Sequence, residues 1–176
     1  MALDHKSFSL EIKAVNDDGF FSGYASVFGV VDSHGDIVAK GAFSASLAAW
    51  AAKKRLPSLL WHHKLDEPIG VWTVMREDDV GLYVEGRLSQ KVQRGAEVYE
   101  LMKIDAVSGL SIGYVTREDS YDRVTDVRTL KQVDLWEVSP VTMPSNEQAR
   151  LTGIKSRDSA ETKNAIQALI NSMRSK

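Results

Sequence analysis

The alternation of apolar and polar residues predicts short β-strands along most of the chain. Residues 8–14 alternate as a half-buried strand does, and a turn at Asn16–Gly19 leads into a second strand over 20–28. Gly23 interrupts that strand and predicts a bulge or a close backbone approach. Further strands are expected at 36–38, 58–63, 71–76, 81–88, 110–117 and 127–138, with turns at Pro68–Gly70 and near Asp119–Asp122.

Helical spacing of apolar residues appears in three places. Residues 43–54 place Phe43, Leu47 and Trp50 on one stripe, and 90–104 follow Ser89, which we expect to cap that helix. A polar linker over 152–159 precedes an amphipathic helix over 160–173. We predict a domain over residues 1–151, and a linker with a docking or autocleaved helix over 152–176. The expected fold is mainly β with helices (α+β): a small closed or strongly curved antiparallel β-barrel of about seven strands.

Composition excludes several classes of protein. The 176 residues are enough for one compact domain, and a net charge of −2 does not favour nucleic-acid or anionic-membrane binding. The absence of cysteine excludes disulfides, thiolate catalysis and cysteine-ligated zinc. No apolar run is long enough for a membrane span, and we expect a cytosolic product.

Ser111 is the first candidate for chemistry. It lies between Gly109 and Gly113, and small neighbours leave room for another backbone to approach a nucleophilic hydroxyl. The alternative is a short strand with a hydrogen-bonded serine and two glycines at bends. An α/β-hydrolase elbow is excluded, because its histidine follows the serine and no histidine follows Ser111.

A base for Ser111 must come from the four upstream histidines, His5, His34, His62 and His63. His62 and His63 end an apolar strand, where neighbouring side chains point to opposite faces, so only one could reach a shared site. Either could instead make a backbone hydrogen bond. The spacing of Asp32, His34 and Asp36 could suit a hard cation, but there is no obvious further ligand. We expect no metal and no cofactor.

Glu137 is the candidate partner for a histidine. Within 130–138 it shares a strand face with Val133 and Leu135, opposite to Trp136. A carboxylate in apolar surroundings needs a partner, and a histidine that it orients would provide one. A structural salt bridge to lysine or arginine, or an inverted face, would explain the same pattern.

Three segments in this order resemble a known family: Leu60–His63 with Pro68–Gly70, Leu110–Tyr114, and Leu135–Ser139 leading to Pro144. Gly35–Val38 and Gly41–Phe43 also fit. They resemble the prohead maturation proteases of tailed bacteriophages, the caudovirus prohead serine protease family, which is similar in fold to herpesvirus assemblin. The resemblance covers roughly residues 8–150.

The resemblance implies a serine endopeptidase with His63 as base, Ser111 as nucleophile and Glu137 as the acid that orients the histidine. Lys64 stands where the family often has an acidic residue. The implied substrates are the scaffold segment of the major capsid protein and the protease itself, cut inside the procapsid in the host cytoplasm. A homodimer is a further expectation. The oxyanion site is expected either in residues 144–146 or at the turn near Ser111. The alternative is a non-catalytic β-barrel module that binds capsid or scaffold.

Overall fold

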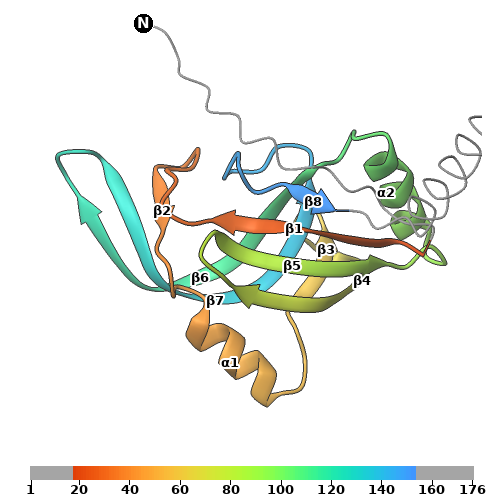
Figure 1. Ribbon diagram of the computed structural model, residues 1–176, viewed down its shortest axis with the longest axis horizontal. Coiled ribbons are helices and arrows are strands. Elements are labelled where there is room, and N and C mark those ends of the chain that lie inside the picture. The colour runs from red at the N-terminus through yellow and green to blue at the C-terminus, as the bar shows by residue number, and fades with distance from the viewer. Residues whose placement is uncertain (1–17, 154–176) are drawn as a thin grey trace, which may run out of the picture.

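The computed structural model describes residues 18–153, which form strands and two helices (Figure 1). The strand predicted over 8–14 and the helix predicted over 160–173 lie outside the described residues. The elements are β1 (Phe20–Val27), β2 (Asp36–Val38), α1 (Ser44–Ala52), β3 (Ser58–Trp61), β4 (Lys64–Glu77), β5 (Gly81–Leu88), α2 (Gln93–Lys103), β6 (Gly109–Asp122), β7 (Val127–Val141) and β8 (Leu151–Gly153).

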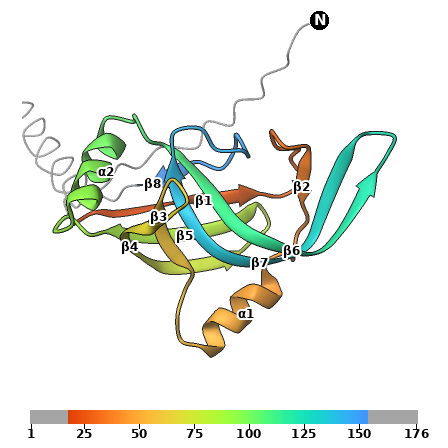
Figure 2. The same cartoon turned by 180° about the vertical axis from the view of Figure 1, so that it is seen from behind.

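The eight strands form one curled sheet in the order β2-β7-β3-β4-β5-β1-β8, and β6 pairs with β7 on its other edge. The sheet bends back on itself, so that Gly109 of β6 bridges Arg150 just before β8 (Figure 2). The predicted strongly curved, mainly β fold is confirmed. The prediction of a wholly antiparallel sheet is wrong, because β2 and β3 both run parallel to β7.

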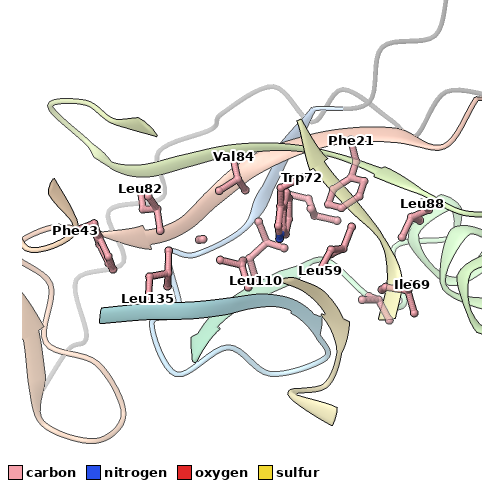
Figure 3. Packing of buried hydrophobic residues seen from close by; sticks show 14 of the residues in the cluster. Phe21, Phe43, Leu59, Ile69, Trp72, Leu82, Val84, Leu88, Leu110 and Leu135 are labelled. Carbon is pink, nitrogen blue, oxygen red and sulfur yellow. The ribbon is translucent and has the colours of Figure 1, made fainter. Parts of the chain in front are cut away.

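Apolar residues from most strands and from α2 fill the inside of the curl (Figure 3). Phe21 and Trp72 meet edge to face there, with ring centroids 5.3 Å apart. Phe43, predicted to lie on an apolar stripe, is fully buried directly before α1. Trp50 of α1 donates a hydrogen bond from its ring nitrogen to the carbonyl of Leu135 (2.8 Å), which ties this helix to β7.

Gly23 allows β1 and the segment before β8 to approach closely. A Cβ at this position would overlap the backbone of Arg150 and Leu151, and the pairing of β1 with β8 shifts register between Ser22 and Gly23. The predicted close approach is therefore confirmed. β8 itself continues to Gly153, two residues beyond the predicted end of the domain.

Three local predictions were wrong. Pro68–Gly70 lies inside β4, where an irregular pairing with β3 accommodates a residue that has no N–H. Ser89 does not cap α2: Val92 holds the N-cap position, and the Ser89 N–H instead donates to the carbonyl of Ile69. The turn expected near Asp119–Asp122 lies at 123–126, because β6 continues to Asp122. No helix within residues 18–153 is long and apolar enough to cross a membrane.

Candidate active site

His62 and His63 are the two central residues of the tight turn that joins β3 to β4. Trp61 and Lys64 pair directly across the turn, and the two histidines have φ angles of 49° and 62°. Positive φ at both central positions is what a type I′ hairpin turn requires, and side chains other than glycine adopt it uncommonly. The prediction that the strand continues through His63 is therefore wrong. The turn, and not strand alternation, sets where each ring points.

His63 lies between Ser111 and Glu137. Its Nε2 is 2.9 Å from the Ser111 hydroxyl oxygen, and its Nδ1 is 2.5 Å from Glu137 Oε1. His62 packs instead against the Trp61 ring, with centroids 4.1 Å apart. Burial lowers the pKa of His62, and its Nε2 has no hydrogen-bond partner within residues 18–153. The structure thus brings His63, and not His62, to Ser111.

Ser111 lies on β6, directly opposite Ser139 of β7. The small neighbours of Ser111 make room for β7 and for the segment after it. Gly113 lies opposite Glu137, and a Cβ there would overlap Glu137 Oε1, so glycine provides the space that the carboxylate occupies. At Gly109 a Cβ would lie 2.7 Å from Pro144 Cδ. Packing of β7 and of the segment after it therefore explains both glycines.

Glu137 is buried, as predicted, with 4% of its surface exposed. The predicted reason is wrong. Gly113 pairs with Glu137 and Tyr114 with Leu135, so Trp136 has no partner and forms a bulge. A bulge shifts the alternation of side chains. Leu135 before it and Val138 after it both enter the core, and Glu137 moves to the face that carries Ser111.

The hydrogen bond to Glu137 raises the pKa of His63, and burial opposes this shift in part. A negative partner stabilises the imidazolium form, which is the form that a base reaches when it removes a proton. The His63 side chain is still 42% exposed, so it can exchange protons with a bound molecule. In this arrangement His63 can accept the hydroxyl proton of Ser111 while Glu137 fixes the orientation of the ring.

His63, Ser111 and Glu137 line a cleft of about 790 Å³. This volume is within the usual range for pockets that bind a ligand. Ser145 and Asn146 line the same cleft, and Asn146 Nδ2 donates to the Val27 carbonyl. The oxyanion donors stay a prediction.

Asp32, His34 and Asp36 also line the cleft, but their contacts are structural. Arg128 holds the Asp36 carboxylate with two hydrogen bonds, at 2.8 and 2.5 Å, which raises the pKa of Arg128. Asp32 Oδ1 accepts the backbone N–H groups of His34 and Asp36, which holds the loop around Gly35 in a turn. Within residues 18–153 no three His, Cys, Asp or Glu side chains are grouped to bind a metal ion.

The sequence matches known proteins over most of its length. The family model described as caudovirus prohead serine protease matches residues 8–165. The chain belongs to the caudovirus prohead serine protease family. The family that three short motifs indicated is thus confirmed, and the chain is a protease of phage capsid maturation.

Individual members of this and related groups show how far the similarity extends. The prohead protease of Enterobacteria phage HK97 is 39% identical over 156 residues, which cover 86% of this chain and 68% of that protein. The capsid polyprotein of Pseudomonas phage PAJU2 is 30% identical over 160 residues, which cover 85% of this chain and 22% of the polyprotein. The bacteriophage T4 capsid assembly protease gp21 superposes with a TM-score of 0.58 at 11% identity, over 69% of this chain and 80% of that one. That superposition supports the prohead protease fold.

Sequence reasoning assigned no role to Ser139, although this residue is fully buried two positions after Glu137. A polar residue at a buried strand position was the available signal, since buried hydroxyl groups are normally hydrogen bonded. The Trp136 bulge left no such signal, because it arises from the register between β6 and β7.

Proposed function

We propose that this prohead protease is a serine endopeptidase in which Ser111 is the nucleophile, His63 the general base and acid, and Glu137 the residue that orients His63. One observation carries the proposal: a single imidazole lies 2.9 Å from a serine hydroxyl and 2.5 Å from a buried carboxylate. The three residues come from different parts of the chain, and they line one cleft of about 790 Å³.

The reaction follows from the geometry. Ser111 Oγ attacks the carbonyl carbon of the scissile peptide bond while His63 Nε2 takes the hydroxyl proton. The tetrahedral intermediate collapses as His63 gives that proton to the departing amine, which leaves an ester on Ser111. A water molecule then attacks the ester carbonyl while His63 takes one of its protons, and His63 returns that proton to Ser111 Oγ as the ester bond breaks and releases the acid. Glu137 stabilises the imidazolium in both steps.

The proposed substrate is the scaffold segment of the phage's major capsid protein, together with the protease itself, inside the procapsid in the host cytoplasm. Membership of the prohead protease family supports a capsid protein as the partner. The match within a relative named as a capsid polyprotein also supports it. Self-cleavage, the role of residues 152–176 as a removable or docking tail, and a homodimer are further parts of this proposal.

Co-expression of the chain with its capsid protein tests the proposal. We expect the capsid protein to be shortened by the wild-type chain and to stay intact with Ser111→Ala. Mass spectrometry of the shortened product would identify the scissile bond and show whether it lies in the scaffold segment. Cleavage that persists at the same bond in Ser111→Ala would disprove the assignment of the nucleophile.

The competing function is a non-catalytic module that binds capsid or scaffold with the same fold. The short contacts of His63 favour the enzyme, because a binding module gains nothing from a serine, an imidazole and a carboxylate in this order. In the same experiment, a wild-type chain that binds the capsid protein and never shortens it would support the module.

A further inference from the structure

Ser139 contacts two parts of the proposed catalytic site at once. Its hydroxyl donates a hydrogen bond to Glu137 Oε2 at 2.5 Å and accepts one from the backbone N–H of His63 at 3.1 Å. The residue is fully buried on β7, opposite Ser111 on β6. Because it is buried, its hydroxyl is in no position to touch a substrate.

A serine hydroxyl has one proton to donate and can accept from other groups. Ser139 donates its proton to the carboxylate, which holds Glu137 Oε2 and leaves Oε1 directed at His63 Nδ1. Its oxygen then accepts an N–H that has no strand partner, since His63 lies within the hairpin turn. The other turn amide, that of His62, donates to the Pro140 carbonyl at 3.4 Å. Two adjacent residues of β7 therefore hold the turn in place.

The turn needs such support. Both histidines adopt positive φ, a conformation that costs free energy and persists only where surrounding contacts determine it. If the turn relaxed, the imidazole would leave Ser111, and if the carboxylate rotated, the ring would lose its orientation. The Ser139 hydroxyl is hydrogen bonded both to the turn at His63 and to the Glu137 carboxylate, so it opposes both movements.

We infer that Ser139 is a positioning residue of this protease, whose hydroxyl locks the His63 turn and the Glu137 carboxylate into one arrangement. The inference rests on the proposed function, because it assigns Ser139 a task in the same site. It adds a fourth residue, which acts through His63 and Glu137 and not on the substrate.

The test compares Ser139→Ala with wild type and with Ser46→Ala as a matched control. Ser46 is also buried and also accepts a backbone N–H, that of Leu135 at 2.9 Å, but it lies on α1 and takes no part in the hydrogen bonds that join His63, Ser111 and Glu137 within residues 18–153. The readout is the rate at which a fluorophosphonate probe labels Ser111, corrected for the folded fraction. We expect labelling to slow by about ten- to a hundredfold in Ser139→Ala, since a buried donor and a carboxylate oxygen both lose a partner. Ser46→Ala should label at the wild-type rate, and Ser139→Thr should recover part of the loss.

The pH profile and the NMR spectrum separate positioning from simple stability. The titratable groups recorded against His63 are Glu137 across the site and His62 beside it. If Glu137 moves away in Ser139→Ala, the acid limb of the labelling profile shifts to lower pH. The strongly deshielded Nδ1 proton of the His63–Glu137 pair should also weaken in the NMR spectrum. A wild-type rate, an unshifted acid limb, or an equal loss in Ser46→Ala would overturn the inference.

Failure of this inference is distinct from failure of the proposed function. If Ser111→Ala abolishes cleavage and Ser139→Ala behaves as wild type, only the role of Ser139 is lost. If Ser111→Ala still cleaves, the nucleophile itself is wrong, and the NMR signal of the His63–Glu137 pair then tests the hydrogen bonds of Ser139 without reference to activity.

Discussion

Two buried carboxylates in the same cleft make an instructive comparison. Glu137 and Asp36 are each only 4% exposed, and each accepts a hydrogen bond from a hydroxyl group, Glu137 from Ser139 and Asp36 from Tyr114. They differ in the basic side chain that each one contacts. Glu137 faces His63, whereas Asp36 faces Arg128.

The partner determines what each carboxylate can do. Arg128 uses two nitrogens on Asp36, its pKa is raised further, and it keeps its proton at any ordinary pH. His63 uses one nitrogen on Glu137 and turns the other to Ser111, and an imidazole can gain and lose a proton near neutrality. Burial of an acid is therefore not a mark of catalysis. What distinguishes the proposed site is a titratable partner whose second ring nitrogen is directed at a serine hydroxyl.

The largest effect is expected from the two adjacent histidines. His63→Ala removes the proposed base, and we expect capsid cleavage to fall by about 10⁴-fold or more. His62→Ala should change the rate by less than about tenfold, because its ring packs on Trp61 and not on Ser111. Cleavage rates on a peptide that spans the mapped site would measure both, and equal losses would contradict the geometry.

The two carboxylates can be compared directly by amide substitution. Glu137→Gln should lower the rate by about 10³- to 10⁴-fold with the fold retained, since an amide cannot stabilise the imidazolium. Asp36→Asn should instead lower the free energy of unfolding by about 1–3 kcal/mol, because Arg128 loses its charged acceptor. Peptide cleavage and urea unfolding measure the two effects. If Glu137→Gln mainly lowered stability and Asp36→Asn mainly lowered the cleavage rate, the roles assigned to the two carboxylates would be wrong.

Gly113 offers a way to displace one carboxylate without changing it. Gly113→Ala places a methyl group where Glu137 Oε1 lies, so the acid must move away from His63. We expect about a ten- to a hundredfold loss of rate, smaller than for Glu137→Gln because the carboxylate is still present. Gly86→Ala is the control, since its Cβ would meet Trp72 and Phe21 in the core and so should affect stability without touching Glu137. A wild-type rate in Gly113→Ala would indicate that Glu137 has freedom to move.

The smallest effect is the response to pH. The pKa of His63 is raised above its ordinary 6.5, and only the neutral ring can accept a proton. Activity should therefore fall about tenfold per pH unit below that raised pKa. The stability that the His63–Glu137 pair contributes has the opposite dependence: it is complete below 6.5 and is lost as pH rises through the raised pKa. Arg128, whose pKa Asp36 raises, should keep its charge from about pH 6 to 9 and provides the contrast. Cleavage rates and unfolding midpoints across this range would check both statements.

The amino-acid sequence by itself determined several features that the structure confirms. Short apolar segments separated by turn residues located the β4–β5 hairpin and most of β1, and the apolar stripe located α1. Three motifs identified the family, and the need to pair a buried acid directed attention to Glu137. These features depend on the order of neighbouring residues, which the sequence contains directly.

The family resemblance already favoured His63, but only the tertiary structure showed why His63 and not His62 meets Ser111, and which face Glu137 occupies. The turn after Trp61 is set by the pairing of β3 with β4, which begins at Lys64, and the bulge at Trp136 is set by the pairing of β7 with β6. The turn and the bulge both change the direction in which the following side chains point. The alternation of residues within one strand does not reveal the register of its partner strand. For the same reason nothing local marked Ser139, whose hydroxyl gains its two partners only when the turn at His63 packs against β7.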